Sequence, residues 1–158
     1  MKPKNYLEPD VFNTIVEYTP LIAIDFAVID NEKILLGKRI NRPAKGCFFV
    51  PGGRICKGET FDEAFARISE AELGIALTRD RCDFIGIYDH MYDDSANDES
   101  ISTHYVVSAF SVSLNHEELD LASLKSQHER IVMLDFNSAL SCPDVHENTK
   151  VYVRKLQE

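Results

Sequence analysis

The sequence is short of basic residues and has no long apolar run. Its 17 lysines and arginines stand against 26 aspartates and glutamates, which gives a net charge of −9. A chain this acidic lacks the basic surface that a phosphate backbone requires, so no nucleic-acid partner is expected. No apolar stretch could span a bilayer, and no signal-type apolar core follows Met1. The sequence therefore predicts a protein without a membrane partner.

Cysteine is also scarce, and linkers are absent. The four cysteines, Cys47, Cys56, Cys82 and Cys142, show no CxxC or other ligand spacing. Reduced thiols in a cytoplasmic protein are the simpler interpretation. No repeat, low-complexity tract or linker divides the chain, and 158 residues suit one compact domain with its own core. We therefore expect residues 1–158 to form a single domain.

The most informative segment is a glycine-rich turn that leads into a helix. Residues 48–50 are a short apolar run typical of a strand, and Pro51, Gly52 and Gly53 end it. Residues 60–63 have the pattern of a capping box that starts a helix. Backbone N–H groups in such a turn, with the Arg54 side chain beside them, suit a phosphate group.

The helix after this turn carries a carboxylate on its apolar face. At about 100° per residue, Phe61, Ala64, Phe65 and Ile68 share one face, and Glu72 falls within about 20° of its centre. An unpaired buried carboxylate costs several kcal/mol, so it should be paired, exposed or bound to a cation. Glu72 either frays to the surface in the last turn or serves as a ligand.

The remaining pattern predicts mixed α and β structure. We expect a helix or arm at 6–18, strands at 21–29, 33–38, 84–88, 102–114 and 130–135, a polar loop at 89–100, and helices at 136–140 and 145–156. Strands on both sides of a central helix suit an α/β class fold, an α/β/α sandwich around a central mixed β-sheet.

Several residues break their local pattern. Asp25 interrupts an apolar strand, so it lies either on the solvent side or in a site, on the face that also carries Ala23. His90 is expected to begin the acidic loop, and His128 to lie in a polar loop before the last strand. By pattern alone both histidines are surface residues and Tyr105 is a core residue.

Six spaced residues resemble the Nudix box of the Nudix hydrolase superfamily: Gly53, Glu59, Arg67, Glu72, Gly74 and Ile75. Ile68 and Ala71 stand where the box has glutamate, so two of its three clustered metal-binding glutamates are absent. Metal-binding glutamates of the box are lost in a similar way in one branch of the superfamily, the GDP-mannose mannosyl hydrolases. This chain resembles that branch over nearly its whole length, through segments 19–21, 36–39, 41–44, 49–54, 71–74, 92–94, 103–107 and 127–128.

The resemblance implies hydrolysis of GDP-mannose, and of GDP-glucose, to GDP and free sugar, with inversion at C1. It implies a homodimer in which residues 1–18 form an N-terminal arm or helix, and one Mg²⁺ or Mn²⁺ per subunit. The implied roles are metal binding by Gly52, Glu72 and Gln127, general base for His128, phosphate contacts by Arg39, Arg54 and Tyr105, and sugar contacts by Asp25 and His90. Arg67 assists the phosphates or only braces Glu59. A conventional Nudix diphosphatase and a non-catalytic nucleotide-sugar sensor remain alternatives.

Overall fold

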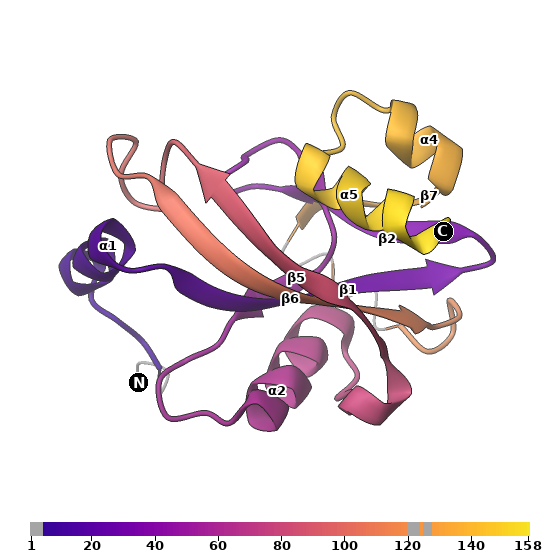
Figure 1. Ribbon diagram of the computed structural model, residues 1–158, viewed down its shortest axis with the longest axis horizontal. Coiled ribbons are helices and arrows are strands. Elements are labelled where there is room, and N and C mark those ends of the chain that lie inside the picture. The colour runs from indigo at the N-terminus through magenta and orange to yellow at the C-terminus, as the bar shows by residue number, and fades with distance from the viewer. Residues whose placement is uncertain (1–4, 120–123, 125–127) are drawn as a thin grey trace.

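Within residues 5–119, 124 and 128–158, which the computed structural model describes, seven strands form one mixed sheet between helices (Figure 1). The elements in chain order are α1 (Pro9–Tyr18), β1 (Leu21–Asp30), β2 (Lys33–Arg39), β3 (Phe48–Phe49), β4 (Gly52–Arg54), α2 (Phe61–Leu73), η1 (Arg79–Arg81), β5 (Asp83–Tyr92), β6 (Thr103–Ser113), β7 (His128–Asp135), α4 (Phe136–Ser141) and α5 (Glu147–Leu156). The predicted α/β/α sandwich with a central mixed sheet is confirmed.

The sheet splits at β1, and this split makes room for the site. The strand order is β3-β2-β1-β6-β5, with β4 paired to β1 and β7 paired to β2. β1 runs parallel to β6 but antiparallel to β2, which it pairs only at the hairpin end, through Ile29↔Ile34 and Asp30↔Lys33. Beyond that point β1 pairs instead with β4, through Asp25↔Gly52 and its neighbours. The glycine-rich turn is therefore held against β1, in the gap that β2 leaves.

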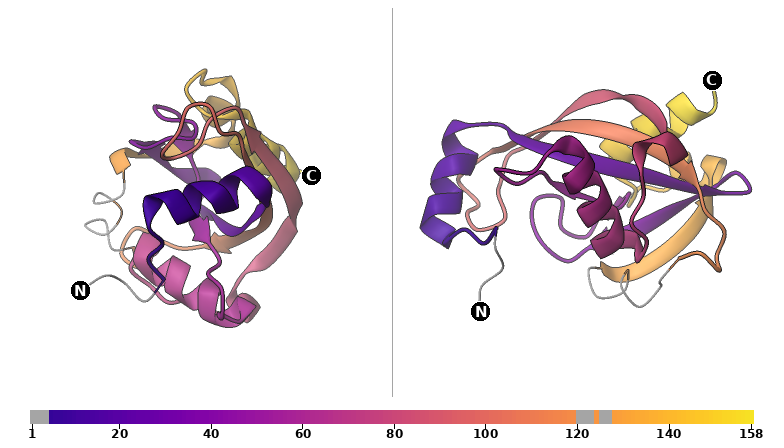
Figure 2. Two further views of the ribbon diagram at one scale, coloured as in Figure 1. Left: turned by 90° about the vertical axis from the view of Figure 1, so that its left-hand side faces the viewer. Right: turned by 90° about the horizontal axis from the view of Figure 1, so that it is seen from below.

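Helices cover both faces of the sheet, each over its own buried cluster. α2 packs Phe65, Ile68 and Leu73 under one face, while α5 packs Tyr152 and Val153 on the other. Figure 1 shows α2 below the sheet, α4 and α5 above it, and α1 apart at one end. The two turned views in Figure 2 also show α1 at that end, away from α5. That residues 1–18 form an N-terminal arm that contributes to a homodimer stays a prediction.

Local signals predicted α2 correctly. The Glu63 N–H donates to Thr60 Oγ1 at 3.3 Å, and the Thr60 N–H donates to Glu63 Oε2 at 2.8 Å, which completes the capping box. Gly74 ends the helix in the left-handed region at φ 75°, where a residue without Cβ fits best. Ser69 stands where the box has an apolar residue, and its buried hydroxyl accepts from the Leu77 N–H at 2.8 Å.

Some predicted boundaries were wrong, and the errors affect site residues. His90 lies inside β5, paired with Tyr105, and not in a loop after residue 88. His128 begins β7, where it pairs with Arg39 of β2, and does not precede the strand. The C-terminal helix starts at Glu147, and β4 was not predicted. In β5 and β7, pairing with a strand distant in sequence makes these polar residues part of a strand, although their local composition favours a loop.

The described residues include no helix that is long and apolar enough to cross a membrane. All four cysteines lie in the described part of the chain, and each is free, in agreement with the expected reduced thiols.

Candidate active site

An ion pair braces the glycine-rich turn from behind. The guanidinium of Arg67, on α2, donates to both carboxylate oxygens of Glu59 and, at 2.9 Å, to the carbonyl oxygen of Arg54. The Glu59 carboxylate also accepts from the Cys56 N–H at 2.8 Å. The hydrogen bond from Arg67 holds the pKa of Glu59 below its ordinary value. Arg67 therefore fixes the path of the turn, and it does not line the hollows described below.

Arg67→Ala is expected to lower the free energy of unfolding by about 1–3 kcal/mol, because it removes charge-assisted hydrogen bonds and leaves Glu59 without its cation. Thermal or denaturant unfolding measures this change. Arg79→Ala is the matched control, because Arg79 forms a similar pair with Asp62 at the exposed surface and should change stability less. If Arg67→Ala leaves the stability unchanged but lowers kcat, Arg67 takes part in the reaction and does not only brace Glu59.

The turn needs glycine because other groups approach it closely. A Cβ on Gly52 would lie 2.2 Å from Asp25 Oδ1, and one on Gly53 would lie 3.1 Å from the side chain of Ile68. Ile68 is fully buried, so the position that carries a glutamate in the box is here part of the core. Ala71, at the other altered position, is exposed.

Glu72 and His128 face each other beside the turn. Glu72 stays within α2, with 16% of its side chain exposed, and its Oε2 lies 3.7 Å from His128 Nε2. His128 is 9% exposed, and within the described residues neither ring nitrogen has a hydrogen-bond partner. A Cβ on Gly37 would lie 2.4 Å from His128 Cγ, so this glycine of β2 makes space for the ring. Glu72 does not fray to the surface.

Two hollows of about 100 and 250 Å³ adjoin at the turn. They share five lining residues, Arg39, Val50, Gly52, Gly53 and Tyr105, so we treat them as one site. Asp25, His90 and Tyr92 line the smaller hollow, and Glu72 and His128 line the larger one. The site therefore has a Glu72–His128 end and an Asp25–His90 end, with arginine and tyrosine side chains between them.

The Asp25–His90 end is a buried hydrogen-bonded group. The Tyr152 hydroxyl, from α5, donates to Asp25 Oδ2 at 2.7 Å and lies 3.2 Å from His90 Nε2. Burial raises the pKa of Asp25 to about 7, although the Tyr152 hydrogen bond opposes the rise. Burial also lowers the pKa of His90 to about 4, so this imidazole is neutral near neutral pH.

Aromatic side chains and a fixed arginine complete the walls. Arg39 donates through Nε to the Pro43 carbonyl at 2.8 Å, and its guanidinium lies 5.8 Å from the ring centre of Phe49. The rings of Tyr92 and Tyr105 meet edge to face at 6.5 Å. Burial raises the pKa of Tyr92 to about 12 and that of Tyr105 above its ordinary value, so both hydroxyls keep their protons and can donate hydrogen bonds.

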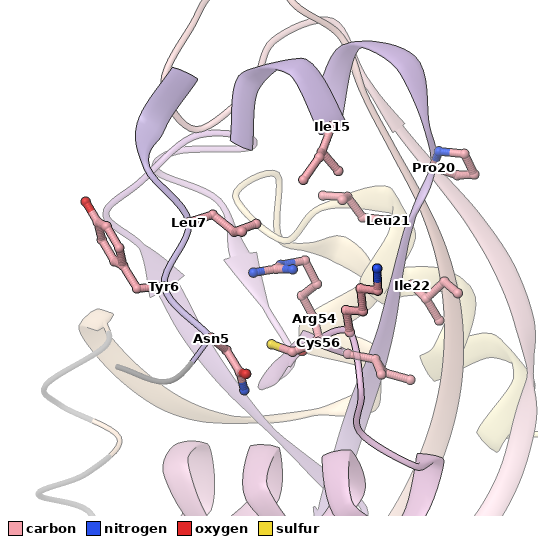
Figure 3. A pocket seen from close by; sticks show the side chains of 11 residues that line it. Asn5, Tyr6, Leu7, Ile15, Pro20, Leu21, Ile22, Arg54 and Cys56 are labelled. Carbon is pink, nitrogen blue, oxygen red and sulfur yellow. The ribbon is translucent and has the colours of Figure 1, made fainter. Parts of the chain in front are cut away.

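Arg54 connects the site to a second cavity beneath α1. This cavity, of about 460 Å³, has mainly apolar walls, and Arg54 lines both it and the smaller hollow. Figure 3 shows the Arg54 side chain reaching from the turn toward Leu7. The guanidinium lies 5.4 Å from the ring centre of Phe12, a cation–π contact that ties the turn to α1.

The Glu72 end of the site has oxygen donors of the kind that a divalent cation binds. Among the described residues, no group of three or more histidine, cysteine, aspartate or glutamate side chains could hold a metal ion. Glu72 is a mostly buried carboxylate beside the Gly52 turn, with His128 as its neighbour. A buried carboxylate in this setting is stabilised by a bound cation. Gln127, the other predicted ligand, lies outside the described residues.

The structure brings most of the predicted site residues together. Those that line the two hollows are Asp25, Arg39, Gly52, Arg54, Glu72, His90, Tyr105 and His128. Asp25 points into the site and not to solvent, and Ala23 shares its hollow as the alternation predicted. Sequence reasoning missed Gly37, Tyr92 and Tyr152. Tyr152 had no usable signal, because a tyrosine on the apolar face of a helix looks like any core residue.

The glycine-rich turn braced on a helix, with a mostly buried acid beside two arginines, fits a hydrolase of nucleoside diphosphate derivatives, and the family comparison supports this activity. The NUDIX domain family matches residues 20–156, and the chain belongs to that family. Nudix hydrolases generally use a divalent metal such as Mg²⁺.

Three similar proteins support this assignment. The low-salt glycan biosynthesis protein Agl8 of Haloferax volcanii is 36% identical over 126 residues, which cover 80% of each chain. An ADP-ribose pyrophosphatase of Methanocaldococcus jannaschii is 46% identical over 56 residues, or 35% of this chain and 33% of that protein. The structure of a MutT NUDIX hydrolase from Burkholderia pseudomallei is 25% identical, with a TM-score of 0.68, and the match covers 87% of this chain and 98% of that one.

Proposed function

We propose that the protein hydrolyses GDP-mannose, and also GDP-glucose, to GDP and free sugar by attack of water at the sugar C1. The observation that carries this proposal is the altered acidic cluster. Ile68 is buried in the core where the box has a glutamate, while the imidazole of His128, which has no hydrogen-bond partner among the described residues, faces the remaining Glu72. A site with one carboxylate and one histidine suits a single metal and an imidazole base.

His128 acts as the general base in this scheme. Its ring is buried next to Glu72, and neither nitrogen has another partner among the described residues, so one nitrogen is available to take a proton from water. The water attacks C1 from the face opposite the leaving diphosphate and inverts the anomeric carbon. The C1–O bond breaks, and GDP leaves with both phosphates intact.

Arg39, Arg54 and Tyr105 bind the departing diphosphate. All three residues line the smaller hollow, where arginine side chains and the protonated Tyr105 hydroxyl can donate to phosphate oxygens. One divalent ion, Mg²⁺ or Mn²⁺, held by Glu72, the Gly52 carbonyl and Gln127, would supply further positive charge there. Asp25 and His90, which line the smaller hollow, contact the sugar hydroxyls.

Two kinds of similarity support a nucleotide sugar as substrate. The chain resembles the GDP-mannose mannosyl hydrolases along most of its length. The Haloferax relative is named for glycan biosynthesis, a process that uses activated sugars, and it matches 80% of this chain. The conventional diphosphatase reaction is the second candidate, since an ADP-ribose pyrophosphatase matches residues of this chain too.

Product analysis tests the proposal. Incubation of GDP-mannose with the protein and Mg²⁺ is expected to give GDP and mannose, measured by anion-exchange chromatography. GMP and mannose 1-phosphate would establish the diphosphatase reaction instead. Tight binding without turnover of any nucleotide sugar would identify a sensor. ADP-ribose is the matched control, because a diphosphatase would split it to AMP.

A further inference from the structure

Tyr152, on α5, places a hydroxyl group at the Asp25–His90 end of the site. Its side chain is fully buried within the cluster under α5, and its ring packs edge to face on Tyr88 at 5.1 Å. Only the hydroxyl leaves this apolar setting, and it lies 2.7 Å from Asp25 Oδ2 and 3.2 Å from His90 Nε2. Phenylalanine would fill the same apolar space. The hydroxyl is therefore needed for its contacts with Asp25 and His90 and not for packing.

The donors and acceptors in this group fix the direction of its hydrogen bonds. Above the Asp25 pKa of about 7, the ionised carboxylate can only accept, so the single hydroxyl proton of Tyr152 goes to Asp25. The hydroxyl oxygen must then accept from the N–H on His90 Nε2. A neutral imidazole has one N–H, so Nδ1 of His90 is left as an acceptor.

We propose that Tyr152 is a positioning residue whose hydroxyl holds the Asp25 carboxylate and the Nε2–H tautomer of His90 in place for the sugar. In this arrangement Asp25 and His90 Nδ1 are both acceptors, which suits a ligand with several neighbouring hydroxyl donors. The tautomer rests on contacts within this chain alone, whereas the assignment to the sugar rests on the proposed function.

Two further contacts join α5 and its N-cap to this end of the site. Asn148, one turn before Tyr152, donates through Nδ2 to the Tyr92 hydroxyl at 3.2 Å. His146, the N-cap of α5, stacks on Phe49 with ring centres 4.7 Å apart. His146, Asn148 and Tyr152 therefore contact four residues that line the smaller hollow, namely Phe49, Tyr92, Asp25 and His90.

The histidine tautomer gives a test that needs no substrate. Long-range ¹H–¹⁵N NMR at mildly alkaline pH is expected to show His90 protonated at Nε2 in the unaltered protein. Tyr152→Phe should change this to a mixture of tautomers, while Tyr88→Phe, which removes a hydroxyl from the neighbouring ring, should leave it unchanged. A His90 protonated at Nδ1 in the unaltered protein, or a spectrum unaffected by Tyr152→Phe, would overturn the proposal.

Kinetics test the link to the sugar. Tyr152→Phe is expected to lower kcat/KM for GDP-mannose about 10-fold or more, while inhibition by GDP changes less than about twofold, because GDP lacks the sugar. Equal losses in both would show a general structural effect and overturn the positioning role. If no nucleotide sugar is hydrolysed by the unaltered protein, the proposed function fails, but the NMR result still decides whether Tyr152 sets the His90 tautomer.

Discussion

His128→Ala is expected to lower kcat for GDP-mannose by about 10²–10⁴-fold, the usual contribution of a general base. The imidazole Nε2 lies 3.7 Å from Glu72 Oε2, and neither ring nitrogen has a hydrogen-bond partner among the described residues. Because the arginines that bind the diphosphate remain, KM should change much less than kcat. Steady-state kinetics across neutral pH measure both constants.

His104→Ala is the matched control for this variant. His104 lies on β6 beside Tyr105, but it is partly exposed and pairs with Asp89 at 3.0 Å, outside the two hollows. Its loss should leave kcat close to that of the unaltered enzyme. A near-normal kcat for His128→Ala across neutral pH would remove His128 from the mechanism.

Glu72→Gln is expected to weaken divalent-metal binding by at least about 10–100-fold, since even changes in residues that only support a ligand have effects of this size. Activity should fall steeply at low Mg²⁺ and recover partly at high Mg²⁺. The metal-free protein should unfold at the same temperature or a higher one, because the change removes a mostly buried charge whose described neighbour is an imidazole 3.7 Å away.

Glu70→Gln provides the comparison within the same helix. Glu70 is exposed on α2, two residues before Glu72, so its loss should affect neither the metal requirement nor the activity. Titration of activity against Mg²⁺, together with thermal unfolding in EDTA, separates the two roles of Glu72. Loss of folding in Glu72→Gln with an unchanged metal requirement would show that Glu72 is structural.

The sequence predicted those parts of the fold whose causes are local. The capping box at Thr60, the apolar stripe and Gly74 specify α2 within one short segment, and its predicted start agrees with the structure. The positions of His90 and His128 were wrong because both lie in strands that pair with distant segments, at Tyr105 and Arg39. No local pattern in a polar stretch indicates such a partner.

The site was predictable where a residue conflicts with its surroundings. Asp25 in an apolar strand and Glu72 on an apolar helix face both gave a physical signal, and both line the hollows. Tyr152 gave none, because its hydroxyl acts on Asp25 across 127 positions of sequence. Gly37 gave no sequence signal either, because it is needed only to leave space for the ring of His128, which lies against it.

The proposed reaction differs from ordinary Nudix chemistry in the atom that water attacks. Hydrolysis of GDP-mannose in ¹⁸O-labelled water, followed at once by mass spectrometry of both products, identifies that atom. Attack at C1 predicts that the label enters mannose and that the GDP carries none. Label in a phosphate of the nucleotide or of a sugar phosphate would contradict the account.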